Sequence, residues 1–249
     1  MLPALYGAGY RISQVCSRKL GSAQALAKMV GSQATDSLTE LDSTADMYIL
    51  TVPDSEIENV LRDAKFGNGM VVHTSGSTPM SVFEKYSIAR YGVLYPLQTF
   101  SRQHGVNFLR VPIYVEGSSP LDTAELMFLA RKLSMDVAQV DSEKRMLLHI
   151  AAVFACNFTN QMTVIAAQLV KNAGLSFTSL KPLIKETYSK ALAADNPYQV
   201  QTGPAVRGDM NTVQKHIDAL SNQPLLQQIY RLISENIMKK WATSPFFTA

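Results

Sequence analysis

The chain has 249 residues, 47% of them hydrophobic, and a formal net charge of +3. This size fits one large domain or two modest ones with an ordinary hydrophobic core. The charge is small and no basic run interleaves with aromatic residues, which argues against a nucleic-acid partner. Cys16 and Cys156 have no metal-binding or redox spacing and are predicted to be small buried side chains.

Two further classes of site are not expected from the sequence. The four histidines show no ligand spacing with cysteines or carboxylates, so no metal site is predicted. The first residues have neither a basic flank nor a long apolar segment, so no signal peptide is expected and a cytoplasmic location is predicted.

The first half of the chain alternates short β-like runs with helical patterns, which is typical of an α/β fold with a mainly parallel sheet. The apolar run 46–52 ends at Pro53, as a buried parallel strand does before its loop. Strands are predicted at 10–16, 46–52, 69–74, 91–95, 113–116 and 136–140, and helices at 20–30, 55–64 and 121–133.

From residue 141 onward the sequence shows no convincing strand. A very long helix through Lys171 is predicted to begin at Ser142 as its N-cap, and later helices are predicted at 177–194, 209–220 and 224–241. The expected organisation is therefore an α/β domain over residues 1–140 and an all-α domain over residues 141–249.

The stretch 146–170 is long and apolar enough to span a membrane. It carries His149, Asn157 and Asn160 near its middle, however, and such residues oppose insertion into a bilayer. We therefore expect a helix buried in a protein core and no membrane partner.

Gly7-Ala8-Gly9 resembles the start of a glycine-rich dinucleotide loop, but its context is reversed. A phosphate loop follows a strand and opens a helix, whereas here a helical tail precedes the glycines and a strand follows them. The pair is predicted to cap the end of a helix that leads into a strand.

Four motifs in the chain resemble those of one family. They are HTSGSTPM at 73–80, YGVLYPLQTFS at 91–101, HIAAVFACNFTNQM at 149–162 and QTGPAVRGD at 201–209. Together they resemble the bacterial Rossmann-like proteins that carry domain of unknown function 2520, over roughly residues 4 to 238. This resemblance implies kinship with deazaflavin-dependent NADP oxidoreductases and pyrroline-5-carboxylate reductase. It also implies a helical domain similar to that of 6-phosphogluconate dehydrogenase.

The resemblance has one large departure at the N-terminus. The family begins with a strand and a glycine-rich loop, and neither is found in this sequence. In a doubly wound sheet that strand is central, so its absence should leave the neighbouring strands without ladder partners. One hypothesis is a start set too late at Met1, or a truncated gene; in-frame codons upstream would then encode the strand and the loop.

The residues that follow three predicted strands are candidates for binding NADP. No acid follows the strand 10–16, and Arg18 could hold a 2′-phosphate, which favours NADP over NAD. The alternatives are a solvated basic turn at Arg18 and an ordinary strand-stop turn at Pro53. The predicted cofactor-binding residues are Ser17, Arg18, Lys19, Thr51, Val52, Pro53, Thr74, Ser75 and Gly76.

Three residues are candidate catalytic groups: His73, His149 and Asn157. His73 and His149 could donate a proton, because histidine titrates near neutral pH. In related hydroxyacid dehydrogenases a lysine lies four residues from an asparagine, but the matching position is Val153. For each candidate, a structural role as a buried, hydrogen-bonded side chain remains open.

Candidate substrate-binding residues are Gln98, Asn160 and Arg207. His149 and Asn160 are eleven residues apart and should share a helical face, with Asn157 next to Asn160. Arg207 could clamp a carboxylate or phosphate, or could instead pair with Asp209.

The resemblance implies an NADP-dependent oxidoreductase that passes a hydride between NADPH and a small carbonyl or imine substrate. It also implies a homodimer formed through the helical domain. The alternative is a non-catalytic homologue that binds a ligand or dimerises, which the missing glycine loop favours.

Overall fold

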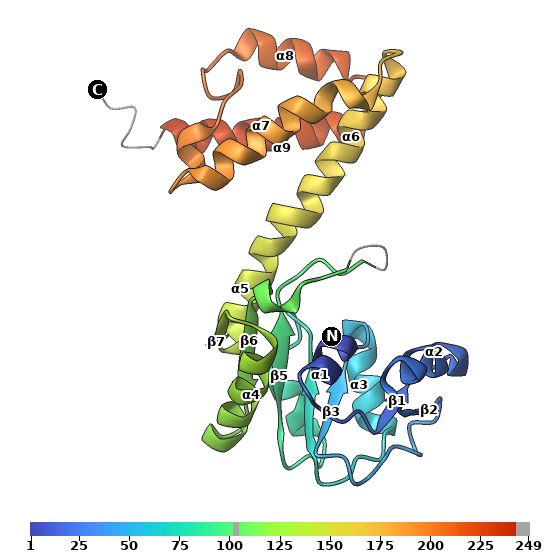
Figure 1. Cartoon of the computed structure of the whole chain (residues 1–249). Helices are drawn as coiled ribbons and strands as arrows, with labels where there is room; N and C mark the ends of the chain where they lie inside the picture. Colours follow the sequence, from blue (N-terminus) through green and yellow to red (C-terminus); the bar gives the residue numbers. More distant parts are fainter. Residues whose placement is uncertain (102–104, 243–249) are drawn as a thin grey trace. The chain divides into compact units, whose positions relative to one another are not determined.

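The computed structural model describes residues 1–101 and 105–242 (Figure 1). It divides into two compact units, Met1–Val164 and Ile165–Ala249. The first unit contains both sheets and the helices packed on them. The second unit consists of helices and connecting turns in its described part.

The first unit contains two separate sheets. The strands are β1 (Gln14–Cys16), β2 (Gln33–Thr35), β3 (Met47–Leu50), β4 (Met70–His73), β5 (Tyr91–Pro96), β6 (Ile113–Gly117) and β7 (Val137–Gln139). β1 and β2 form a two-stranded parallel sheet, and the other five form a sheet in the order β3-β4-β5-β6-β7. Among the described strands, only the β5–β6 pair is antiparallel. The predicted mainly parallel, Rossmann-like α/β fold is confirmed.

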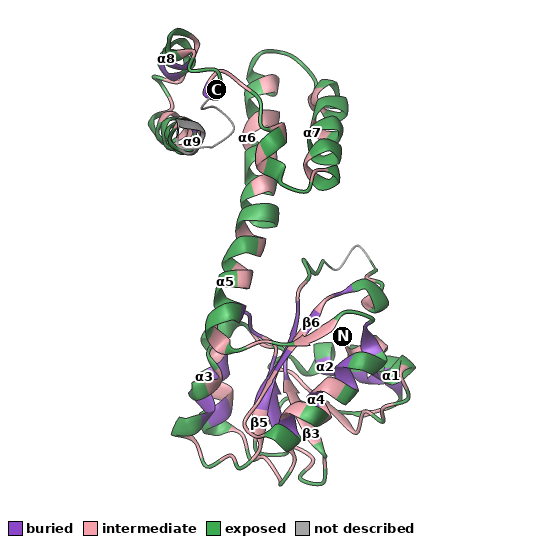
Figure 2. Cartoon of the chain, turned by 90° about the vertical axis from the view of Figure 1, so that its left-hand side faces the viewer, coloured by how far each residue is buried: buried purple, intermediate pink, exposed green. Residues whose placement is uncertain are grey.

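Helices cover both faces of the larger sheet. They are α1 (Leu2–Gly7), α3 (Asp54–Asp63) and α4 (Pro120–Leu133), with short 3₁₀ turns η1 (Met80–Lys85) and η2 (Phe108–Arg110), whereas α2 (Leu20–Val30) packs on β1 and β2 of the smaller sheet. Met70 and Val72 of β4 pack with residues of α1 and α4, whereas Val71 packs with residues of α3 and η1. Because successive strand side chains alternate between faces, all four residues of β4 are buried. The neighbouring strand β5 is also buried along most of its length (Figure 2).

The N-terminal region agrees with the predicted departure from a complete Rossmann sheet. Within the described residues the first element is the helix α1, and no strand joins β1 to β3. The α1 helix ends at Gly7, and Gly9 follows with φ +86°, a conformation that favours glycine. The predicted helix cap at Gly7 and Gly9 is therefore confirmed. The side chains of β1 are only half-buried, whereas those of β4 are fully covered.

One continuous helix carries the chain out of the first unit. It comprises α5 (Ser142–Ala152), a π-helical turn η3 (Val153–Phe158) and α6 (Thr159–Asn172). Its N-cap is Asp141 rather than the predicted Ser142, because the Asp141 carboxylate accepts the Lys144 N–H at 2.8 Å. The predicted domain boundary at residue 141 stays a prediction; the more compact division falls inside this helix, after Val164.

The expectation that this helix is buried in a protein core is wrong for the single chain. The stretch Ser142–Asn172 is the one described helix long and apolar enough to cross a membrane, and 0% of its most apolar window is buried. Length and composition alone are a weak indication of a membrane span. The helix is exposed because no other described element of the chain covers its apolar side chains, such as Leu147 and Phe154.

The second unit contains only helical elements among its described residues. They are the end of α6, then η4 (Phe177–Leu180), α7 (Lys181–Ala193), η5 (Pro197–Val200), α8 (Met210–Ala219) and α9 (Pro224–Ala242). Pro182 lies in the first turn of α7, where the backbone N–H groups have no partner within the helix. The missing N–H of proline therefore breaks no hydrogen bond, and the helix begins here without a bend. The predicted all-α region after the sheet is confirmed.

Candidate functional site

The loops that follow β1, β3 and β4 meet at one edge of the first unit. Arg18 Nη1, after β1, lies 3.6 Å from Glu56 Oε1 in the first turn of α3. Ser77 Oγ, after β4, donates to Asp54 Oδ2 at 2.5 Å. In open α/β sheets, ligands bind where the carboxyl ends of parallel strands meet. All nine predicted cofactor-binding residues lie on these three loops.

The loop after β4 is held by its own side chains. Ser75 Oγ accepts the backbone N–H of Ser77 at 3.1 Å and that of Thr78 at 2.9 Å. The backbone N–H of Ser75 donates to His73 Nδ1 at 3.2 Å. These bonds satisfy the polar groups of the turn and fix its path, so Gly76 is presented in one position.

His73 is fully buried at the end of β4. Its ring stacks on Phe83 at a centroid distance of 5.5 Å, and its Nε2 has no hydrogen-bond partner among the described residues. Burial, reinforced by the positive charge of Arg145, lowers the pKa of His73 from 6.5 to about 4. The side chain is therefore neutral at pH 7 and out of contact with solvent, which favours its structural alternative over proton donation.

A buried arginine fixes the start of α5 against this loop. Arg145 forms an ion pair with Glu116 of β6, and its Nη2 donates to the Thr78 carbonyl at 2.6 Å. The Ser142 hydroxyl joins the same cluster: it donates to Glu116 at 2.8 Å and accepts the Met80 N–H at 2.9 Å. The helix, the loop and the sheet are thus tied together by charge-assisted hydrogen bonds.

The same helical face brings His149 onto the loop. His149 lies four residues after Arg145, so both side chains project on one side of α5. His149 Nδ1 is 3.1 Å from Tyr95 Oη, at the end of β5. A Cβ added at Gly76 would lie 2.6 Å from His149 Nδ1 and 2.8 Å from Tyr95 Cζ. Only glycine lets this loop approach the Tyr95–His149 pair so closely.

Tyr95 is suited to hold a proton. Only 7% of the residue is exposed, and burial raises the pKa of its hydroxyl above the ordinary value. The phenol is therefore protonated at neutral pH, with its oxygen in contact with a histidine nitrogen. Such an arrangement can pass a proton between the phenol and the imidazole.

An open cavity of about 770 Å³ lies beyond the end of β5, within the first unit. Its walls are segments 98–101 and 105–107, Arg110, and three residues of the long helix: Cys156, Asn157 and Asn160. The predicted residues Gln98, Asn157 and Asn160 are therefore brought together, and His149 does not line this cavity. Cys156 is exposed here, so its predicted burial is wrong.

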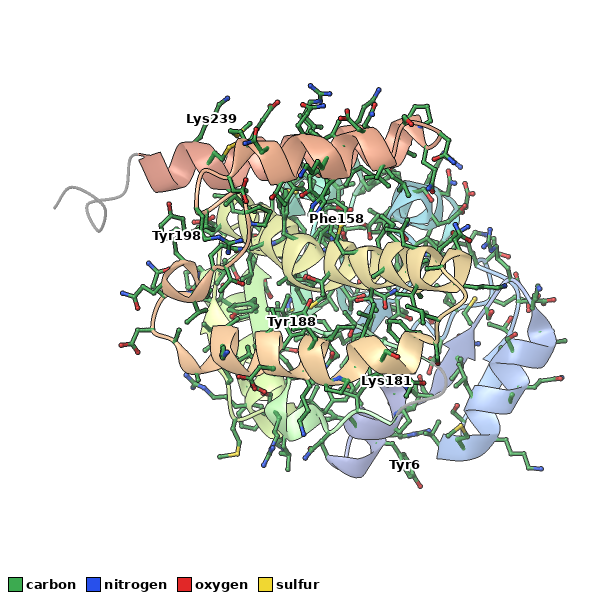
Figure 3. The ribbon with its side chains drawn as sticks, turned by 90° about the horizontal axis from the view of Figure 1, so that it is seen from above. Tyr6, Phe158, Lys181, Tyr188, Tyr198 and Lys239 are labelled. Atoms are coloured by element: carbon green, nitrogen blue, oxygen red, sulfur yellow. The ribbon has the colours of Figure 1, made fainter. Side chains whose placement is uncertain are left out.

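The π-helical turn explains why the spacing argument for His149 and Asn160 fails. Eleven residues of a regular α-helix make close to three turns, but the wider turn at Val153–Phe158 shifts the phase of all later residues. Phe158, labelled in Figure 3, ends this turn, and its ring meets that of Phe154 at 5.0 Å. π-Helical turns occur frequently at functional sites.

Several of these residues were not identified as functional from sequence. The sequence patterns do not single out Arg145, Glu116 or Arg110, and Tyr95 falls only within the motif at 91–101. Glu116 carries a usable signal, since it is a charged residue inside an apolar strand. Arg207 lies in the exposed turn before α8, in the second unit, and its substrate role stays a prediction.

Acid should destabilise the protein through His73. In the unfolded chain the imidazole takes up a proton below about pH 6.5, whereas in the folded chain it does so only near pH 4. The unfolded state therefore binds more protons as the pH falls, and stability drops between these values. From pH 7 to pH 4.5 this loss should be about 2 to 3 kcal/mol.

The test is urea unfolding of the parent protein and of His73→Asn at both pH values. Asparagine offers an oxygen near the position of Nδ1, so the Ser75 N–H keeps an acceptor. The variant should lose less stability on acidification than the parent by about 2 to 3 kcal/mol. Equal losses in the two proteins would show that His73 is not the buried neutral group.

Comparisons with known proteins agree with this arrangement. A family model described as a domain of unknown function (DUF2520) matches residues 111–237. A second model, described as "NADP oxidoreductase coenzyme F420-dependent", matches residues 1–75. A search of curated proteins found no match.

Solved structures extend the match over the whole chain. A "putative NADP oxidoreductase" from Bacteroides fragilis is 41% identical, with a TM-score of 0.84, over 96% of this chain and 92% of that one. A Thermotoga maritima protein is 23% identical, with a TM-score of 0.74, over 94% and 95%. An imine reductase from Myxococcus stipitatus in complex with NADP⁺ is 14% identical, with a TM-score of 0.69, over 96% and 89%.

The Thermotoga maritima protein and the imine reductase are only 23% and 14% identical to this chain, so these two comparisons show a similar fold and nothing more. The DUF2520 model covers half of the chain, and the Bacteroides fragilis protein is similar along nearly the whole of both sequences. The chain therefore belongs to the DUF2520 family of Rossmann-like oxidoreductases.

Proposed function

We propose that this oxidoreductase uses NADP and reduces a small imine or carbonyl substrate. The observation that carries the proposal is the Tyr95–His149 pair, which lies against Gly76 at the edge where the cofactor loops meet. The similarity to an NADP⁺-bound imine reductase and to pyrroline-5-carboxylate reductases supports this reaction class. The predicted cytoplasmic location belongs to the same proposal.

The residues of the described chain fit part of a nicotinamide dinucleotide. The Arg18 side chain is 80% exposed, and no acid stands directly after β1, so a 2′-phosphate can approach its guanidinium. Gly76 is buried against the Tyr95–His149 pair, where any side chain would clash with both residues. Before α1 the described residues comprise Met1 alone, so the glycine-rich loop that cradles a pyrophosphate is not among them.

When bound, NADPH would supply the hydride. Tyr95 would donate the proton that the reduced nitrogen or oxygen of the substrate needs. His149 would then return a proton to the phenolate through the 3.1 Å contact between Nδ1 and Oη. Asn157, on the wall of the adjoining cavity, would orient the substrate rather than transfer a proton.

Reductase activity should depend on the Tyr95 hydroxyl. Tyr95→Phe should lower kcat for NADPH-dependent reduction of 1-pyrroline by 10²- to 10⁴-fold, because general acid catalysis contributes about that factor. NADPH consumption at 340 nm follows the reaction, and NADPH binding checks that the cofactor site is intact. The matched control is Tyr6→Phe, on α1, whose side chain is largely exposed. Equal rates for Tyr95→Phe and the parent would remove Tyr95 from the mechanism.

Arg18 should distinguish NADPH from NADH. Arg18→Ala should weaken NADPH binding about tenfold or more and leave NADH binding unchanged, because only NADPH carries the 2′-phosphate. Calorimetric titration of both cofactors measures this, with Arg62→Ala, an exposed arginine on α3, as the control. An equal loss for both cofactors would contradict the proposed phosphate contact.

The same titration separates the enzyme from a non-catalytic homologue. The second reading is a non-catalytic homologue that binds a ligand or forms a dimer. An NADP-dependent enzyme should bind NADPH in this titration. Absence of NADPH binding would favour a ligand-binding or interaction protein.

We also propose that the protein is a homodimer in which a second copy covers the long helix. Its apolar side chains are uncovered in the single chain: Leu147 is 67% exposed and Phe154 is 64% exposed. Light scattering should give twice the chain mass of 27.4 kDa. Phe154→Asp should shift the mass to that of one chain, whereas Phe128→Asp on α4 should not. A parent protein of single mass would refute the dimer.

A further inference from the structure

The cavity beyond β5 has an unusual chemical character. Arg110 is the one charged group among its described lining residues, and no acid accompanies it. Within the described parts of the chain, Arg110 makes no ion pair. An unpaired guanidinium that faces an acid-free cavity is available to an anionic ligand.

Arg110 is held in place by its neighbours rather than left on a loose loop. The η2 turn is capped by Asn107, whose Oδ1 accepts the Leu109 N–H at 3.2 Å. The Arg110 N–H donates to the Asn107 carbonyl at 3.1 Å, and the next residue, Val111, is 1% exposed. The backbone of Arg110 is therefore fixed between a capped turn and a buried anchor.

The amide side chains of the cavity present donors. Gln98 Oε1 already accepts the backbone N–H of Thr99 at 2.8 Å and its hydroxyl at 3.3 Å. Asn107 Oδ1 is likewise occupied by the Leu109 N–H. Because these oxygens are occupied, the NH₂ groups of Gln98 and Asn107 are left to bind a ligand.

We propose that this cavity binds a carboxylate on the substrate, with Arg110 as its ion-pair partner and Gln98 and Asn107 as hydrogen-bond donors. A planar guanidinium matches a carboxylate with two parallel hydrogen bonds, and neutral donors beside it complete the oxygen contacts. The inference rests on the proposed reductase function and narrows it: the substrate is an imino or oxo acid, and the carboxylate is the group by which it is recognised.

The test measures binding without turnover. Saturation-transfer NMR compares 2-oxopentanoate with 2-pentanone, which has the same number of carbons and carries a methyl group in place of the carboxylate. The parent should bind 2-oxopentanoate at least tenfold more tightly than 2-pentanone. Arg110→Gln should remove most of this difference, and Arg110→Lys should restore part of it, because lysine keeps the charge but not the fork.

Controls define the site. Arg131→Gln removes an exposed arginine from α4 and should leave both affinities unchanged. Circular dichroism checks that each variant is folded. Inorganic phosphate should compete only weakly; competition as strong as that of 2-oxopentanoate would indicate a general anion site and overturn the proposal. Equal binding of 2-oxopentanoate and 2-pentanone, or an Arg110→Gln variant that binds like the parent, would overturn it as well.

Failure of this inference and failure of the proposed function give different results. If NADPH is bound and 1-pyrroline is reduced, but the acid binds no better than the ketone, only the carboxylate site is wrong. If 2-oxopentanoate binding depends on Arg110 but no NADPH binds to the chain, only the reductase function is wrong.

Discussion

The candidate site depends on one buried ion pair, between Arg145 and Glu116. A guanidinium with 1% side-chain exposure is tolerated only where its charge and most of its donors are satisfied. Glu116 supplies the charge, and the Thr78 carbonyl and the Ser142 hydroxyl supply further acceptors. Removing Glu116 would leave a buried charge unpaired, at a cost of about 3–5 kcal/mol. The ion pair therefore fixes how α5 is rotated about its own axis and where its first turns lie relative to the sheet.

Two consequences follow from that fixed rotation. His149 lies one helical turn after Arg145, so the same rotation places its side chain in contact with Tyr95. The charge of Arg145 also acts on His73, where it adds to the effect of burial and keeps the imidazole neutral. Arg145 thus helps to position the half-buried His149 for proton transfer and to keep the fully buried His73 neutral. His73, in the first motif, therefore has a structural role, whereas His149, in the third motif, is the candidate for proton transfer.

Local patterns in the sequence were sufficient for most of the fold. The apolar run around β4 and the amphipathic run of α2 depend on neighbours along the chain, and both were predicted correctly. The reversed context of Gly7 and Gly9 was also a local signal. Short strands without a clear pattern were harder: β2 was not predicted, and the strand expected from residue 10 begins only at Gln14. There, tertiary pairing rather than periodicity sets the bounds.

The site was less predictable because its contacts join distant parts of the sequence. Tyr95 and His149 are 54 positions apart, and Arg145 and Thr78 are 67 apart. Contacts between residues so far apart cannot be predicted from the spacing of residues in a single sequence. The π-helical turn adds a second difficulty, since it alters the helical period that related His149 to Asn160. Arg110 lies in a single 3₁₀ turn whose role is visible only once the cavity has been formed.

The separation of the two sheets has a consequence for how the first unit opens. In the described residues no backbone ladder crosses from β1 to β3, so the β1–β2 sheet is joined to the rest by packing and by side-chain contacts. Side-chain packing between two sheets weakens gradually as they move apart, whereas the hydrogen bonds of a backbone ladder are lost together. We therefore expect local opening at the seam between the sheets, and Arg18 lies directly after β1 on the side of the smaller sheet. A dinucleotide bound across that seam would contact both sheets and hold them together. The two sheets would then open as one unit, although no described backbone ladder joins them.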